Sequence, residues 1–128
     1  MNVAIVNTFA NFGGAAKAAR RLHDGLNKNG QNSTMYVAQG NGDGVVTGHF
    51  IGSAYCRLKK KFRSWEIRRS FTKYLHTRPQ GFDTFSDDRS SYGSSPIKDL
   101  LKFDLINFHW IAGFLNYSSI PALRHIPI

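Results

Sequence analysis

The sequence predicts an α/β domain built on a parallel sheet. A short β-branched apolar run at 2–7 leads into a glycine pair and an amphipathic helix, and a second apolar run at 33–38 follows about thirty residues after the first. This spacing is the length of a strand–helix–strand unit, and the right-handed crossover of such a unit makes its two strands parallel. With 128 residues the chain is expected to form a single domain, 1–128.

The first strand and helix are the clearest elements. A strand is expected at 2–8, because its apolar residues are β-branched and bounded by polar ones. The helix after Gly14 ends at Gly30, a residue that readily adopts the left-handed conformation after a helix. Its apolar stripe has steps of three and four: Ala16, Ala19, Leu22, His23 and Leu26.

The middle of the chain predicts a turn followed by a basic helix. Residues 40–53 are rich in glycine, and Asp43 is their only acidic residue, so a bend is favoured over a calcium loop. A helix over about 53–77 would be apolar on two opposite sides. A break or kink near 64–70 is the simpler interpretation, and a helix held from both sides is the alternative. One side comprises Tyr55, Leu58, Phe62 and Trp65, and the other Ile67, Phe71, Tyr74 and Leu75.

The last third of the chain predicts a polar loop, a short helix and a third strand. Residues 78–95 form a loop long enough to suggest function, and Ser95 is expected to cap a helix at 96–103 that has Pro96 in its first turn. The third strand is expected at 104–109, and a short helical piece at 118–125. The final "HIPI" resembles the start of a fourth strand. Since doubly wound domains usually have five or more strands, we expect more chain or another chain to complete the sheet.

The positive charge of the protein is concentrated in one segment. The net charge is +9, and residues 57–78 contain nine basic residues and only Glu66 as an acid, a local net charge of +8. Three interpretations are open: a solvated cationic surface, a face for anionic membrane, or a nucleic-acid patch. The first two have similar weight, and nucleic acid has less because no RNA- or DNA-binding motif is present. The candidate membrane-facing residues are Lys59, Lys60, Lys61, Arg63, Trp65, Arg68 and Arg69.

Cysteine content and hydropathy suggest a cytoplasmic chain. The single Cys56 excludes an internal disulfide, and the N-terminus lacks the charge and apolar run of a signal peptide. No run approaches the roughly 18 apolar residues of a membrane span. We therefore expect a cytoplasmic protein, with peripheral attachment to the inner membrane face if the basic segment binds lipid.

Two candidate site motifs lie at the same predicted sheet edge. The Gly13-Gly14 loop matches neither G-x-G-x-x-G nor the P-loop pattern, so an anion site at a helix N-terminus and a structural turn are equally supported. His109 and Trp110 follow the third predicted strand, at the edge where open α/β sheets bind ligands. Ordinary packing of these two side chains is the alternative.

Other catalytic patterns are missing from the sequence. The five histidines show no metal-ligand spacing with cysteine or carboxylate, so no metal site is expected. The sequence shows no catalytic pattern around Cys56, which is expected to be inert. There is also no G-x-S-x-G nucleophile motif.

Three stretches resemble one family. "GGAAKAARRLHDGL" (13–26), "FSDDRSSYG" (85–93) and "DLINFHWIAGFLNYSSIPAL" (104–123) are similar, in this order, to the N-terminal part of bacterial glycosyltransferases with the GT-B fold. The similarity is to the retaining family 4 group, which builds capsular, colanic-acid-like and other surface polysaccharides. It covers roughly a third of the chain.

The resemblance implies an enzyme of two Rossmann-like domains with a cleft between them. The N-terminal domain takes the saccharide acceptor, which is expected to be lipid-linked, and the second domain binds a nucleotide-sugar; no other cofactor is implied. By this resemblance Gly13, Gly14 and Ala15 approach the donor diphosphate or the acceptor. His109 and Trp110 line the acceptor side of the cleft.

The chain departs from the family after residue 123. The "LHD" stretch of the relatives and the donor domain with its glutamates do not follow, so we expect an incomplete N-terminal domain with a basic helical insertion and no transferase activity of its own. A stand-alone α/β module that binds anionic membrane or nucleic acid is the alternative. An incomplete sheet has an exposed edge, so we also expect a homo-oligomer formed through that edge or through the helices.

Overall fold

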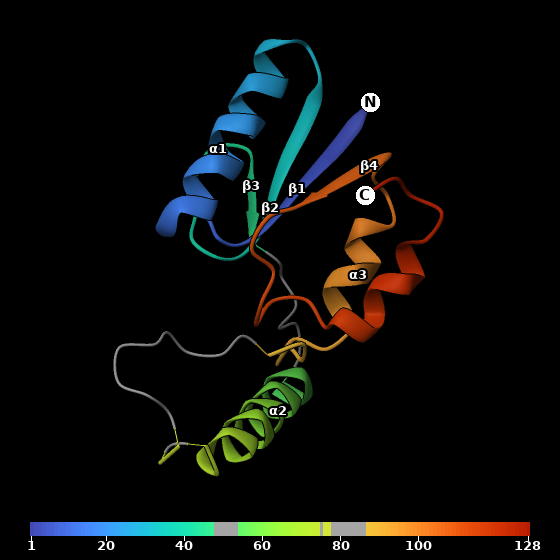
Figure 1. Ribbon diagram of the computed structural model, residues 1–128. Coiled ribbons are helices and arrows are strands. Elements are labelled where there is room, and N and C mark those ends of the chain that lie inside the picture. Colours follow the sequence, from blue (N-terminus) through green and yellow to red (C-terminus); the bar gives the residue numbers. More distant parts are fainter. Residues whose placement is uncertain (48–53, 75, 78–86) are drawn as a thin grey trace.

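The described residues form one parallel sheet with helices on both sides. The computed structural model describes residues 1–47, 54–74, 76–77 and 87–128 (Figure 1). In this part of the chain the sheet has four strands in the order β3-β2-β1-β4. The strands are β1 (Asn2–Phe9), β2 (Asn32–Gln39), β3 (Val45–Thr47) and β4 (Leu105–Phe108). The helices are α1 (Gly13–Lys28), α2 (Ala54–Thr72), α3 (Ser95–Leu100) and the 3-10 helix η1 (Tyr117–Leu123).

All strand pairs are parallel, as the sequence predicts. Asn2 of β1 pairs with Asn32 of β2, and Val3 pairs with Leu105 of β4. The α/β class and a parallel sheet compatible with a Rossmann-like fold are therefore confirmed.

Alternation along β1 distributes its side chains between two apolar layers. Val3 and Ile5 pack with Ala19 of α1, since successive strand residues point to opposite faces. Ala4 and Val6 belong to the other layer, which includes Leu100 of α3 and Leu123 of η1. Figure 1 shows α1 on one side of the sheet and α3 with the C-terminal segment on the other.

The strand order creates a switch point between β1 and β4. After β1 the chain continues to β2 on one side, whereas β4 lies on the other side of β1. This order matches the first four strands of the doubly wound arrangement, in which ligands bind outside the carboxyl ends of the strands at such a point. The site is therefore expected where β1 and β4 end.

The outer edge of β4 is partly covered by the C-terminal residues. The Ile106 amide donates a hydrogen bond of 3.0 Å to the Pro127 carbonyl, so the "HIPI" segment begins to pair beside β4. No strand is assigned there in the described residues. Oligomerisation through a sheet edge stays a prediction, which sedimentation at high concentration can check.

The bend expected over 40–53 is present at 40–44, but the expectation is wrong for 45–47. Residues 45–47 form β3, which pairs with β2 in parallel at Met35–Val45. Parallel neighbours usually need a connection of a dozen residues or more, whereas here residues 40–44 suffice. Gly40 and Gly44 have φ of 106° and 65°, which allow the tight return. Residues 48–53 lie outside the described part.

The expected break in the basic helix is also wrong. Helix α2 runs without interruption from Ala54 to Thr72, through the 64–70 stretch. It is not held from both sides either, because the apolar side chains of one face remain exposed while Ile67 and Phe71 on the other are half-buried. One apolar face of α2, with Ile67 and Phe71, thus packs against the rest of the protein, and the other remains exposed.

The later elements agree with the sequence except at their ends. Helix α3 ends at Leu100 instead of residue 103, and Ser94, not Ser95, occupies the position before it, without a capping side-chain hydrogen bond. Strand β4 falls within the expected range, and η1 begins one residue before its expected range, at Tyr117. Among the described residues, none of the helices has both the length and the apolar content that crossing a bilayer requires.

A buried histidine links α1 to β2. His23 is 3% exposed, its Nδ1 lies 3.1 Å from the Ser33 hydroxyl oxygen, and its Nε2 lies 3.2 Å from the Asn27 side-chain nitrogen. Asn27 also accepts a hydrogen bond from the Ser33 amide. Burial, with a smaller contribution from Arg20, lowers the pKa of His23 below its ordinary value near 6.5.

Stability is expected to fall as the pH drops below about 6.5. The unfolded chain binds a proton at His23 near that pH, whereas the folded chain binds it only at lower pH. The free energy of unfolding should therefore decrease by up to about 1.4 kcal/mol per pH unit until the folded-state pKa is reached. Urea unfolding at pH 7, 6 and 5 tests this. His23→Gln should show a weaker pH dependence, and equal slopes for both proteins would contradict the assignment.

Candidate functional site

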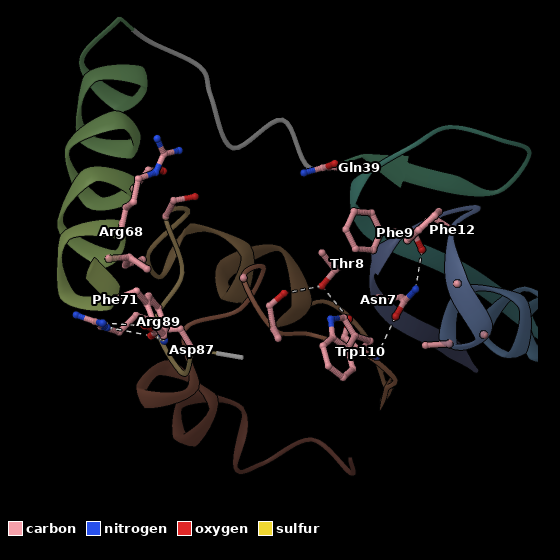
Figure 2. Close-up of a pocket in the computed structure, with 18 residues that line it drawn as sticks. Asn7, Thr8, Phe9, Phe12, Gln39, Arg68, Phe71, Asp87, Arg89 and Trp110 are labelled. Atoms are coloured by element: carbon pink, nitrogen blue, oxygen red, sulfur yellow. Dashed lines mark hydrogen bonds and ion pairs between the residues drawn. The ribbon is translucent and has the colours of Figure 1, made fainter. Parts of the chain in front are cut away.

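A cleft of about 870 Å³ opens at the carboxyl ends of β1 and β4, the switch point of the sheet (Figure 2). Its walls come from the end of β1, the start of α1, the segment 110–113, α2 and the segment 87–91. The lining residues used below are Asn7, Thr8, Phe12, Gly13, Gly14, Ala15, Ile67, Arg68, Phe71, Asp87, Arg89 and Trp110.

The glycine pair forms an uncapped helix start at this cleft. Helix α1 begins at Gly13, whose φ is +84°; the preceding Phe12 provides no capping hydrogen bond, and the first turn has no acidic residue. Amide N–H groups at a helix start lack intrahelical partners and carry partial positive charge. A Cβ at Gly13 or Gly14 would meet no atom within 4 Å. The backbone is therefore accessible to a ligand.

The two glycines are expected to respond differently to alanine. Gly13→Ala places a side chain in the left-handed region, which costs about 1–2 kcal/mol of unfolding free energy. Gly14 has no positive φ, so Gly14→Ala should leave the stability unchanged or raise it by up to about 1 kcal/mol. Urea denaturation of both variants measures the difference. Equal losses of unfolding free energy in the two variants would show that the left-handed backbone at Gly13 does not require glycine.

Two polar residues at the end of β1 hold Trp110 in place. The Asn7 side-chain oxygen accepts a hydrogen bond of 2.9 Å from the Trp110 amide. The Thr8 amide and hydroxyl both lie within hydrogen-bond distance of the Trp110 carbonyl, at 2.7 and 2.8 Å. The Trp110 side chain is 53% exposed. A rigid backbone thus presents an aromatic ring to the cleft.

The predicted His109–Trp110 pair is divided. Trp110 lines the cleft, but His109 does not. The His109 amide donates to the Val6 carbonyl at 3.0 Å, and its Nε2 is buried without a hydrogen-bond partner among the described residues. The structure therefore brings Gly13, Gly14, Ala15 and Trp110 together and leaves His109 outside the cleft.

Helix α2 provides a wall that the sequence reasoning missed. Ile67, Arg68 and Phe71 line the cleft, although the sequence predicts only a basic surface for this helix. The signal was present in the second apolar face of the helix. What the sequence lacked was the position of that face relative to the sheet edge.

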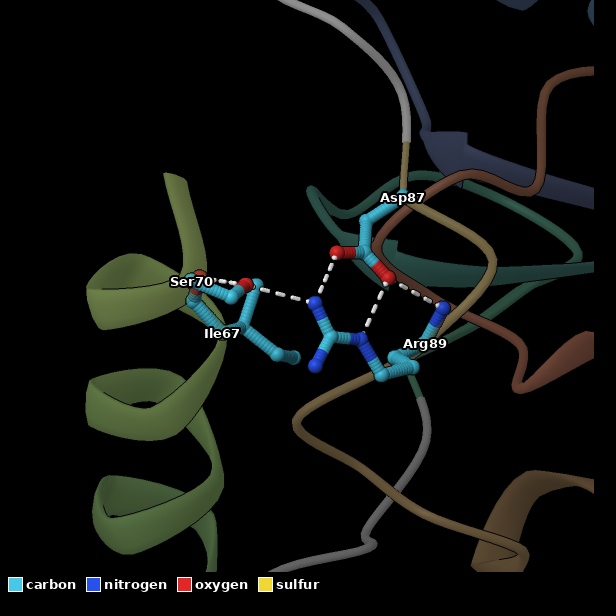
Figure 3. Close-up of polar contacts among 4 residues, drawn as sticks. All are labelled: Ile67, Ser70, Asp87 and Arg89. Carbon is cyan, nitrogen blue, oxygen red and sulfur yellow. Dashed lines mark hydrogen bonds and ion pairs between the residues drawn. The ribbon is translucent and has the colours of Figure 1, made fainter. Parts of the chain in front are cut away.

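An arginine joins α2 to the segment after residue 86 (Figure 3). Arg89 donates to both carboxylate oxygens of Asp87, at 2.9 and 2.7 Å, and its Nη2 also donates to the Ser70 hydroxyl at 2.7 Å. The hydrogen bond from Arg89 lowers the pKa of Asp87, and the same bond raises the pKa of Arg89. The pair therefore stays ionised near neutral pH.

The neighbouring Ser90 anchors this segment to the body of the protein. It is 3% exposed, and its hydroxyl donates to the Phe114 carbonyl at 2.6 Å. Two residues further along, the ring of Tyr92 packs under Lys60 of α2. The Lys60 ammonium lies 3.9 Å from the centroid of this ring. These contacts hold α2 beside the cleft.

The charges around the cleft favour an anionic ligand. Arg68 and Arg89 line it, whereas Asp87 is engaged by Arg89. Together with the positive end of α1, this leaves a net positive field. The cleft can therefore bind a phosphate-bearing group beside an aromatic ring.

The candidate membrane residues divide between two sides of α2. Lys60 contacts Tyr92, and the Arg63 guanidinium lies against Gly93, where an added Cβ would clash with it. The other five are exposed. Four of them line surface grooves of the helix, namely Lys59, Lys61, Trp65 and Arg68, and Arg69 lies on its open surface. Two of the seven residues, Lys60 and Arg63, therefore contact residues outside α2.

In the part of the chain that the structure describes, no three His, Cys, Asp or Glu side chains gather in a way that could hold a metal ion. Comparison with protein families, curated proteins and solved structures found no match to this chain. Fold and cleft define an α/β protein with a ligand cleft at the switch point of a parallel sheet.

Proposed function

We propose that this chain is the acceptor-side domain of a glycosyltransferase. The enzyme would move a sugar from a nucleotide-sugar to a saccharide acceptor in surface polysaccharide biosynthesis. The observation that carries the proposal is the cleft at the switch point, where the glycine pair, the uncapped start of α1 and Trp110 meet. The same residues carry the resemblance to this enzyme group.

Each wall of the cleft has a role in this proposal. The N–H groups at the start of α1 stabilise negative charge on the diphosphate leaving group, as preorganised donors do in other transferases. The exposed ring of Trp110 provides an apolar surface for one face of a sugar, and Arg68 adds positive charge from the opposite wall.

The domain needs a second domain for the reaction. Among the described residues that line the cleft, Asp87 is the only carboxylate, and Arg89 holds it in a bidentate ion pair. It is thus not available as a general base. The donor-binding domain of the proposed enzyme supplies the remaining catalytic groups, so the 128-residue chain should be inactive by itself.

Two measurements test this proposal. Incubation with uridine and guanosine diphosphate sugars should release no nucleotide above the buffer rate, and turnover would disprove the inactivity of the isolated chain. In the Trp65→Phe variant Trp110 is the only tryptophan, so it is the only source of tryptophan fluorescence. Titration of this variant with uridine diphosphate should change the fluorescence along a curve that saturates. A flat signal together with no heat of binding in calorimetry would disprove the cleft as the diphosphate site.

A further inference from the structure

One face of α2 is apolar, exposed and surrounded by basic residues. We call Tyr55, Leu58, Phe62 and Trp65 the outer face; they are 63%, 68%, 62% and 53% exposed. Their spacing of three and four residues places them along one side of the helix. No residue of this 19-residue helix is buried. The opposite side, with Ile67 and Phe71, contributes to the cleft.

The cations of α2 lie close to these rings. The Lys59 ammonium is 4.4 Å from the centroid of the Tyr55 ring, and the Arg69 guanidinium is 5.3 Å from that of Trp65. Lys59 and Lys61 also line a shallow groove of about 540 Å³ together with Tyr55, Leu58 and Phe62. Apolar side chains are thus bordered by flexible cationic ones, whose stems can extend along an apolar surface while their charges remain hydrated.

We propose that the outer face of α2 docks on an anionic lipid surface. An interfacial helix buries aromatic and leucine side chains at the headgroup boundary and keeps its basic residues among the headgroups. Helix α2 has seven basic residues and only Glu66 as an acid. The charge and the exposed apolar groups together match a negatively charged membrane surface.

Two other occupants fit this face less well. A second copy would bring two strongly positive helices together, with only Glu66 on each to offset the repulsion. Nucleic acid would use the cations and rings, but the exposed Leu58 has no π-face on which a base could stack, whereas it fits the acyl boundary of a lipid surface.

Docking in this orientation would place the cleft next to the membrane. Arg68 lines both the cleft and a groove beside Trp65, so the two adjoin along α2. A ligand carried by a lipid would then reach the cleft without leaving the surface. The docking itself does not depend on which reaction the cleft supports.

Flotation of the 128-residue chain with lipid vesicles tests the proposal. We expect recovery with phosphatidylcholine vesicles containing about 30% phosphatidylserine, and little with phosphatidylcholine alone. Lys59→Gln/Lys61→Gln should lower the partition coefficient about 25-fold, because each basic residue contributes about fivefold near an anionic surface. Phe62→Ser/Trp65→Ser should also lose binding, and both pairs are exposed, so the fold should be retained.

The control variant carries the same change of charge elsewhere. Lys17→Gln/Arg21→Gln alters two exposed basic residues of α1 and should keep vesicle binding. Equal recovery on both vesicle types, or an equal loss in the control, would overturn the proposal. So would binding of a 20-nucleotide single-stranded DNA without vesicle binding, or a dimer that Phe62→Ser/Trp65→Ser converts to a monomer without any vesicle binding.

Discussion

Replacing Phe114 by alanine is expected to lower the free energy of unfolding by about 3–5 kcal/mol. Phe114 is fully buried, and its ring lies 5.9 Å from that of Tyr36 and 5.8 Å from that of Tyr92. It packs in the apolar layer that includes Leu100 of α3 and Leu123 of η1, and it directly follows Gly113, which lines the cleft. Removing the ring leaves a cavity between these elements, and a domain of this size has about 5–15 kcal/mol of stability in total.

Phe12→Ala is the control for this prediction. Phe12 loses the same atoms but is 76% exposed at the mouth of the cleft. Its substitution should change stability by no more than about 0.5 kcal/mol. Thermal and urea unfolding measure both variants. A similar loss for the two would show that Phe114 is not part of the core.

Trp110→Ala is expected to weaken saccharide binding in the cleft about tenfold or more, with little change in stability. Exposed aromatic anchors dominate binding when a ligand covers them, and a loss of about 1.4 kcal/mol corresponds to a factor of ten. The backbone of Trp110 is held by Asn7 and Thr8 through main-chain groups that the substitution retains. The effect should therefore be confined to the ligand.

The chain contains a control for this variant. Trp65 is exposed to the same extent as Trp110, 53%, but it lies outside the cleft. Trp65→Ala should bind maltose, lactose and chitobiose as the unchanged chain does. Isothermal titration calorimetry with these disaccharides compares the three proteins, and equal affinities for all of them would reject Trp110 as a sugar-binding residue.

The first strand, helix and second strand could be predicted because their signals are local. The apolar run at 2–7, the stripe of α1 and Gly30 each appear within a few residues, and the thirty-residue spacing then determines parallel pairing. Strand β3 was missed for the opposite reason. Three residues are too few to show a period, and its pairing depends on an unusually short glycine-rich return.

Half of the candidate site could be predicted, and the other half could not. Gly13, Gly14 and Trp110 follow strands whose carboxyl ends meet at one edge, so strand order brings them together. Arg68, Phe71 and Arg89 come from segments whose positions depend on contacts such as Arg89 with Ser70. No local pattern predicts such a contact.

The amino-acid pattern alone establishes an α/β class, a parallel sheet and a segment that carries nearly all of the net charge. These properties follow from periodicity and composition, which act over short distances along the chain. Tertiary structure was needed to decide that α2 is continuous, that one of its faces borders the cleft while the other stays exposed, and that His109 lies outside the site. Each of these depends on packing between residues far apart in sequence. The free energy of that packing arises only when the two segments are in contact, so the sequence pattern of one segment alone does not reveal it.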